Sequence, residues 1–234
     1  MARRLQRWWV AAAALASTGL ALPAHALSVG MADTFQSGSD GGWSMGTSST
    51  IPAVVVNDGG PTGAGDGYLS LVAIGGVSAN SRMAVIAGPQ WAGNYTDTDS
   101  DTTPPAADVK GITMDVRNFG STDLDLRLRL AGPGGVFALS TTAVHVPAGS
   151  GWVSISFPLA PTDLTGQAVA TLVDVQQLRL FHSSTATFPG DYVVASLGVD
   201  NITAVPEPAA AWLWLAGLAA VGARRVASRR PQTH

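Results

Sequence analysis

Strict alternation of apolar and polar residues is the feature that most constrains how this chain can fold. Every second residue from 124 to 130 is leucine, and the residues between them are Asp125, Arg127 and Arg129. Successive side chains of a β-strand point to opposite faces of a sheet, so the pattern predicts a strand with one buried face and one wet face. Six further segments repeat the alternation or are rich in β-branched and aromatic residues: 68–74, 112–117, 143–146, 153–157, 178–180 and 192–199.

Glycine-containing turn segments separate these candidate strands, at 57–61, 118–120, 132–135 and 148–151. One segment, 167–174, is a candidate for a short helix. Many strands at short spacing, with glycine-rich turns and almost no helix, are typical of two packed antiparallel sheets. The sequence therefore predicts a single all-β domain with the architecture of an antiparallel β-sandwich.

The N-terminus has the three parts of an export signal. Three arginines among the first seven residues precede an apolar run from 8 to 22, and the small residues Ala24 and Ala26 follow it. A basic region, an apolar region and a small-x-small site make up a secretory signal peptide. We predict a signal helix within 1–26 that signal peptidase removes after Ala26. An uncleaved N-terminal anchor is the alternative.

The C-terminus is also built from three parts in a set order. Pro206-Glu207-Pro208 precedes an uncharged apolar stretch at 209–223, which Arg224 and Arg225 follow at once. The two prolines stop any strand or helix from continuing through the motif. A helix of fifteen residues reaches about 22 Å, a marginal span for a hydrocarbon core of about 30 Å. Positive charge beyond the stretch stays on the cytoplasmic side, so we predict a C-terminal transmembrane helix.

This order of motif, apolar helix and arginines resembles the PEP-CTERM sorting signal of Gram-negative bacteria that make exopolysaccharide. The resemblance implies that an exosortase recognises residues 205–234 and cleaves near Pro206-Glu207-Pro208. The chain would be anchored in the inner membrane transiently and then released to the envelope or the extracellular space. A plain C-terminal anchor is the alternative. The mature domain predicted between the two signals is 27–204.

The charge of this central part excludes several classes of partner. Between 27 and 205 there are six basic residues, fifteen aspartates and no glutamate, a net charge of about −9. Such a surface repels nucleic acids and anionic lipid headgroups, and favours cations and neutral ligands. The chain has no cysteine, which excludes disulfides and thiolate chemistry.

Short motifs along the central part resemble those of jelly-roll β-sandwiches, the carbohydrate-binding modules and laminin-B-like domains. In chain order they are Asp33-Thr34-Phe35, Gly41-Gly42-Trp43, Asp66-Gly67-Tyr68-Leu69, Gly151-Trp152, Leu178-Arg179-Leu180 and Gly198-Val199-Asp200-Asn201-Ile202. In such domains a structural Ca²⁺ often joins the first and last strands, so the resemblance implies that Asp33 and Asp200 are calcium ligands. Hydrogen bonding of Asp200 to a neighbouring turn, as an acceptor, is the alternative.

The acidic repeat Asp97, Asp99 and Asp101 places oxygen ligands at alternate positions, as Ca²⁺ requires, but it lacks the glycine and flanking helices of an EF-hand. We interpret it as a solvated loop. Among the aromatic residues, Trp43 and Trp152 are predicted to lie in the core. Trp91 and Tyr95, in a glycine-containing loop segment, are the candidates for a ligand-facing surface; a loop pinned by its own aromatics is the alternative.

Nothing in the sequence ranks one set of residues as a catalytic site. His145 and His182 are the only histidines between 27 and 205, neither has a second histidine at ligand spacing, and no Gly-x-Ser-x-Gly is present. We expect a non-catalytic envelope or extracellular-matrix protein associated with exopolysaccharide or biofilm. A dedicated carbohydrate-binding module with structural calcium is the alternative, and a glycan-active enzyme is a third class.

Overall fold

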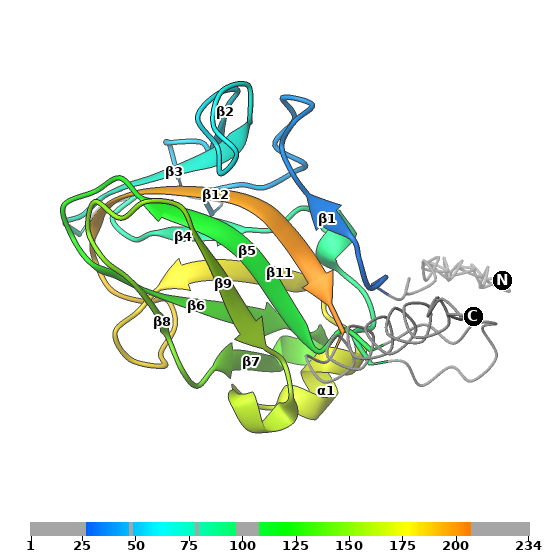
Figure 1. Cartoon of the computed structure of the whole chain (residues 1–234). Coiled ribbons are helices and arrows are strands. Elements are labelled where there is room, and N and C mark those ends of the chain that lie inside the picture. Colours follow the sequence, from blue (N-terminus) through cyan, green and yellow to red (C-terminus); the bar gives the residue numbers. More distant parts are fainter. Residues whose placement is uncertain (1–26, 47–48, 78–79, 97–107, 207–234) are drawn as a thin grey trace, which may run out of the picture.

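The alternating segments pair into two antiparallel six-stranded sheets that lie face to face (Figure 1). The computed structural model describes residues 27–46, 49–77, 80–96 and 108–206. Within these ranges the predicted all-β sandwich is confirmed. The predicted signal helix, the acidic loop with Asp97, Asp99 and Asp101, and the predicted helix beyond Pro208 lie outside the described residues.

The first sheet is built around its longest strand. Its members are β1 (Ala32–Asp33), β2 (Val54–Val56), β3 (Tyr68–Ile74), β5 (Gly111–Asn118), β9 (Val153–Pro158) and β12 (Val194–Val205). The order across the sheet is β2-β3-β12-β5-β9, and β1 pairs with the C-terminal part of β12. The pairing of β12 with β5 shifts between Asp200 and Thr203, where Asn201 has a φ of +50°.

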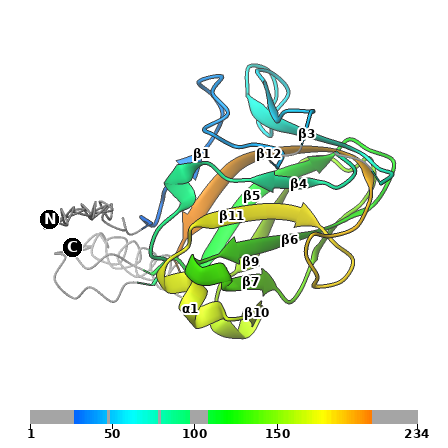
Figure 2. The same cartoon turned by 180° about the vertical axis from the view of Figure 1, so that it is seen from behind.

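The second sheet lies behind the first and faces the viewer in Figure 2. Its members are β4 (Ala84–Ile86), β6 (Leu124–Ala131), β7 (Phe137–Ser140), β8 (Val144–Val146), β10 (Leu164–Gly166) and β11 (Gln177–His182). The order is β10-β7-β6-β11-β4, and β8 pairs with β6. The expected short helix is α1 (Ala168–Val173); three 3-10 turns are η1 (Pro89–Trp91), η2 (Pro133–Gly135) and η3 (Pro161–Asp163).

The core lies between the two sheets and is made by the apolar residue of each alternating pair. The four leucines of β6 are at most 1% exposed, and Leu69, Leu71, Leu197 and Val199 of the first sheet face them with exposures of 0–1%. The intervening residues point away from the core and form an outer face on each sheet. These outer faces hold the candidate functional residues.

The last strand continues to Val205, one residue beyond the predicted end of the domain, and only Pro206 follows it in the described part of the chain. The carbonyl oxygen of Val205 accepts a hydrogen bond from the backbone N–H of Lys110 at 2.9 Å. The described helices include none long and apolar enough to cross a membrane.

Candidate functional site

The segment that holds Trp91 and Tyr95 turns into the core instead of facing solvent. Trp91 is 0% exposed and Tyr95 is 1% exposed. The backbone of this segment pairs with the stretch after α1, where Gly93 and Val175 exchange hydrogen bonds of 2.7 and 2.8 Å, and the Tyr95 hydroxyl donates to the Trp91 carbonyl at 2.8 Å. The prediction of a ligand-facing surface at these two residues is therefore wrong. The loop is pinned by its own aromatics.

Asp33 ties this segment to the first strand. Its Oδ2 atom accepts hydrogen bonds from the indole N–H of Trp43 and of Trp91, both at 2.7 Å, and from Nε2 of Gln90 at 2.9 Å. The two indole rings meet edge to face, with centroids 6.1 Å apart. Trp43 is 2% exposed, which confirms its predicted place in the core. Asp33 therefore acts as an acceptor for three N–H donors, and this role differs from the predicted one as a calcium ligand.

Asp200 stands in a different environment from Asp33. It is 0% exposed, and neither carboxylate oxygen has a hydrogen-bond partner within the described residues. Burial, against a smaller lowering by the backbone N–H of Asn201 and with the negative charges of Asp66 and Asp115 added, raises the pKa of Asp200 to about 6. Asp115 is the direct partner of Asp200 across β5 and β12, so the two side chains share the outer face of the first sheet. A buried and unpartnered carboxylate of this kind is costly unless it is protonated or bound to a cation.

Asp200 fits a hard divalent cation in charge and in ligand type. Ca²⁺ takes six to eight oxygen ligands, which include carboxylates, backbone carbonyls and water. In the part of the chain that the structure describes, no group of three or more acidic or histidine side chains has the arrangement of a metal site. Asp200 would therefore need backbone carbonyls and water to complete a coordination shell.

Three aromatic side chains that are far apart in the sequence meet on the outer face of the first sheet. Tyr68 begins β3, Phe119 follows β5, and Trp152 precedes β9. The Tyr68 and Phe119 rings are stacked at 5.7 Å, and Trp152 meets them edge-on at 5.2 and 6.2 Å. We call these three residues the aromatic cluster. Phe119 is 40% exposed, and the other two are half-buried.

The aromatic cluster depends on a glycine beneath it. A Cβ atom at Gly198 of β12 would lie 2.8 Å from Trp152, 2.9 Å from Phe119 and 3.1 Å from Tyr68. Glycine inside a strand commonly marks such a close approach, and this was the one sequence signal for the cluster. The prediction that Trp152 lies in the core is wrong because Val153 pairs with Val116, which points inward, so the residue before it points outward.

Polar groups lie around the aromatic cluster on the outer face of the first sheet. The guanidinium of Arg117 lies 4.5 Å from the Phe119 ring centre, and its buried Nε has no hydrogen-bond partner among the described residues. The Trp152 indole N–H donates to the carbonyl of Gly59 at 3.0 Å, which holds the ring in place. Ser70 pairs with Gly198 and so carries a hydroxyl on the same face. The arrangement offers flat rings beside hydrogen-bonding groups.

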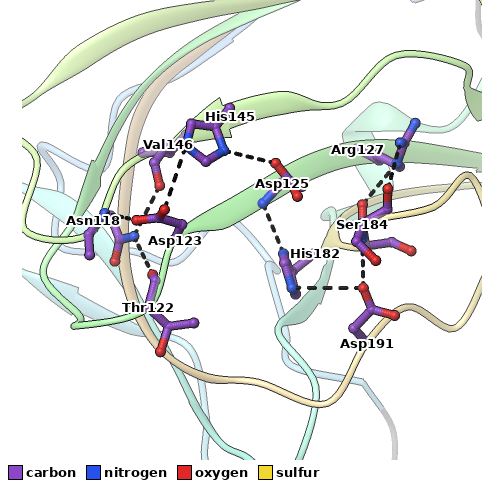
Figure 3. Close-up of polar contacts among 12 residues, drawn as sticks. Asn118, Thr122, Asp123, Asp125, Arg127, His145, Val146, His182, Ser184 and Asp191 are labelled. Carbon is purple, nitrogen blue, oxygen red and sulfur yellow. Dashed lines mark hydrogen bonds and ion pairs between the residues drawn. The ribbon is translucent and has the colours of Figure 1, made fainter.

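The two histidines of the domain belong to a polar network beside β6 (Figure 3). His145 is exposed, as its position on β8 predicts, and its Nδ1 lies 3.0 Å from Oδ1 of Asp125. This contact raises the pKa of His145. His182 Nδ1 accepts the backbone N–H of Asp125 at 2.9 Å. These contacts join β6, β8 and β11, so both histidines have structural partners.

The C-terminal segment matches a known sorting signal. Residues 204–230 match the family described as the PEP-CTERM protein-sorting motif, and the match contains Pro206, Glu207, Pro208, Arg224 and Arg225. It begins at Ala204, inside β12. The motif implies export, transient membrane anchoring and processing by an exosortase. No curated protein matches the chain.

Solved structures are similar in fold at low sequence identity. An exo-beta-agarase has a TM-score of 0.53 and 13% identity; the match covers 77% of this chain and 25% of the agarase, so the chain spans about a quarter of that enzyme. Two carbohydrate-binding modules are also similar. The family 11 module from Clostridium thermocellum, solved with a beta-1,3-1,4-mixed-linked tetrasaccharide, has a TM-score of 0.47 and 14% identity, with 78% of this chain and 98% of the module covered. A module specific for non-crystalline cellulose, CBM28, has a TM-score of 0.49 and 11% identity, with 79% and 99% covered. At these identities the likeness concerns the fold alone.

Proposed function

We propose that this exported protein with a PEP-CTERM motif is a non-catalytic polysaccharide-binding protein of the cell envelope or extracellular matrix. The observation that carries the proposal is the aromatic cluster of Tyr68, Phe119 and Trp152 on the outer face of the first sheet. Its ligand would be the exopolysaccharide that surrounds the producing cell, which gives the protein a role in a biofilm matrix.

The chemistry of the aromatic cluster suits a sugar chain. Aromatic rings provide large contact areas at low entropic cost, and tyrosine and tryptophan combine an apolar body with a polar tip. A pyranose ring has an apolar face that can stack on such rings, while its hydroxyl groups can bond to Arg117 and Ser70. The strongly negative charge of the domain favours a neutral sugar chain on this face over a dense polyanion.

The test is the affinity of the purified protein for neutral polysaccharides in native affinity electrophoresis. The probes are mixed-linkage β-glucan and agarose, which are neutral, and the exopolysaccharide of the producer. We expect Phe119→Ala and Trp152→Ala to weaken binding at least about tenfold, a loss of about 1.4 kcal/mol. Val169→Ala removes an exposed apolar side chain from α1 and is the matched control, with unchanged binding expected. Equal binding by all variants, or release of reducing sugar by the protein, would contradict the proposal.

We also propose that both termini are removed during export. Signal peptidase would recognise the small residues Ala24 and Ala26 and cut after Ala26. The exosortase would cut at Pro206-Glu207-Pro208, just before the helix expected to span the inner membrane. Mass spectrometry of the protein recovered outside the cytoplasm should show a chain that begins at Leu27 and ends before Ala209. An intact chain from Met1 to His234 inside the cell is the contrary result.

Asp200 is our candidate ligand for a structural calcium ion. Support comes from its complete burial, its two unpartnered oxygens and the neighbouring charges of Asp66 and Asp115. The ion would neutralise a buried negative charge at the irregular point of β12. Of the two predicted calcium ligands, Asp33 and Asp200, this proposal retains only Asp200. Asp33 instead accepts hydrogen bonds from indole N–H groups.

A further inference from the structure

The outer face of the second sheet gathers several arginines, and Arg82 among them is close enough to Asp191 for its charge to lower the pKa of that carboxyl. Arg129 of β6 and Arg179 of β11 are direct partners in the antiparallel pairing, so their side chains lie opposite each other. Both guanidinium groups lie over the ring of Phe188, at 4.6 and 5.3 Å from its centre. Arg82, two residues before β4, lies 3.8 Å over the ring of Tyr192. Across the described ranges, none of these three arginines forms an ion pair with a carboxylate.

This placement is unfavourable unless something compensates it. Like charges directly opposite on neighbouring strands destabilise a sheet. Burial lowers the pKa of Arg129 and of Arg179, and the charge of Arg129 lowers the pKa of Arg179 further. The domain has fifteen aspartates and only six basic residues, so the sequence offers more carboxylates than basic residues to pair with. Arg129 and Arg179 therefore have no carboxylate counter-charge among the described residues, and an external anion could supply one.

Arg127, on the same face of β6, shows what a structural arginine looks like in this sheet. Although the alternation predicts a wet position, Arg127 is only 6% exposed. Its guanidinium donates to the backbone carbonyls of Ser183, Ser140 and Thr141 at 3.0, 2.9 and 2.7 Å, and reaches the carbonyl of Ser184 (Figure 3). This hydrogen bonding accounts for its burial.

The N–H groups of Arg129 and Arg179 are far less used than those of Arg127. Within the described residues Arg179 donates from Nε to the side-chain oxygen of Gln177 at 2.6 Å, and Arg129 makes ring contacts alone. The terminal nitrogens of both side chains therefore have donors left for a ligand. The ring of Phe188 holds the two guanidinium groups, and Phe181 supports that ring edge-on at 5.6 Å.

A pocket opens beside this arginine pair. It has a volume of about 180 Å³, and its lining includes Arg82, Arg179, Phe188, Ser81 and Ala84. Pockets for drug-sized ligands have about 300–1,000 Å³. The smaller volume of this pocket suits one sugar unit of a longer polysaccharide. The lining combines cationic donors, hydroxyl groups and an aromatic ring, which are the groups that would recognise a charged sugar.

We propose that Arg82, Arg129, Arg179 and Phe188, the arginine face, bind the carboxylate groups of a uronic-acid polysaccharide. Guanidinium groups bind carboxylates through paired hydrogen bonds, and the adjacent ring can contact the sugar. A polyuronate carries one carboxylate on each sugar, so a short stretch of it offers carboxylates to several guanidinium groups. Denser polyanions and anionic membranes would be repelled by the surrounding charge of about −9. The arginine face lies on the opposite side of the sandwich from the aromatic cluster and does not depend on it.

The experiment compares two forms of one polymer. Native affinity electrophoresis of the purified protein is run with polygalacturonate and with its methyl ester, which has the same sugars without the charge. We expect polygalacturonate to retard the protein, the ester to have little effect, and the Arg129→Gln/Arg179→Gln double variant to bind at least about tenfold more weakly. Lys110 lies away from the arginine face and forms an ion pair with Asp108. The Lys110→Gln variant therefore removes one positive charge elsewhere on the protein and should bind polygalacturonate as the wild type does. Trp152→Ala should also keep its binding to polygalacturonate, which separates this proposal from the first.

Three results would overturn the inference: equal affinity of the double variant, equal affinity for the methyl ester, or stronger binding to phosphatidylglycerol vesicles than to polygalacturonate. The last result would assign the arginine face to a membrane. Thermal unfolding checks that the double variant is folded. If it is not, the single variants Arg129→Gln and Arg179→Gln replace it, and each should weaken binding several-fold; wild-type affinity in both would refute the proposal equally.

Discussion

Replacement of Asp33 with alanine should lower the free energy of unfolding by about 3–5 kcal/mol, the largest loss expected from a single side chain outside the apolar core. The reason is that one carboxylate oxygen accepts the indole N–H groups of both Trp43 and Trp91, at 2.7 Å each. Both rings are almost fully buried, so neither N–H could turn to water after the substitution. Each buried donor left unpaired costs about 1–3 kcal/mol, and hydrogen bonds to charged groups lie at the upper end.

Thermal and urea unfolding of Asp33→Ala against the wild type measure this loss. Asp40→Ala is the matched control, because Asp40 lies in the same region and accepts one backbone N–H, from Gly42, at an exposed turn. Its effect should stay below about 1 kcal/mol. Adding Trp91→Phe to Asp33→Ala should cost less than the sum of the single effects, since it removes one of the unpaired donors. A strictly additive pair, or an Asp33→Ala loss as small as the control, would show that the indole hydrogen bonds contribute little.

The strands were the predictable part of this fold because their signal is local. Alternation in β5, β6 and β9 reflects one buried and one outward face, and the same residues that show the pattern form the core. The faces of isolated aromatics were less predictable. The Gly151-Trp152 motif suggested a core position for Trp152, although the alternation of β9, extended back by one residue, places its side chain outward, as the pairing of β9 with β5 shows.

The candidate sites were less predictable than the strands because they depend on contacts between distant segments. Trp91 and Tyr95 stand beside glycine, which suggests an exposed loop, but backbone pairing of Gly93 with Val175 brings the segment inward. The aromatic cluster unites residues 68, 119 and 152, and the pairing of Arg129 with Arg179 joins β6 to β11. A single sequence does not reveal the register between strands, so a strand glycine such as Gly198 signals a close approach without showing which side chains gather over it.

Replacement of Asp200 with asparagine should stabilise the protein when calcium is absent and remove its response to calcium. Burial raises the folded-state pKa of Asp200 to about 6, from an ordinary value of 3.8. A raised carboxyl pKa means that the folded state binds the proton more tightly than the unfolded state does. Stability is therefore lost as the pH rises from about 4 to about 6, and the loss of about 3 kcal/mol remains at pH 7. Asparagine does not titrate in this range, so the variant escapes the loss.

Calcium should offset most of this loss in the wild type, because a cation bound by the Asp200 carboxylate favours its charged form. For a dissociation constant a hundredfold below the free calcium concentration, the wild type gains about 2.7 kcal/mol and the Asp200→Asn variant gains nothing. Unfolding at pH 5, 6 and 7.5, in EGTA and in calcium, measures both effects. Asp174→Asn at the end of α1 serves as the control and should respond to calcium as the wild type does. Persistent stabilisation of Asp200→Asn by calcium would place the ion elsewhere, and equal stability of the variant and the wild type in EGTA at pH 7.5 would show that the buried carboxylate is already compensated within the protein.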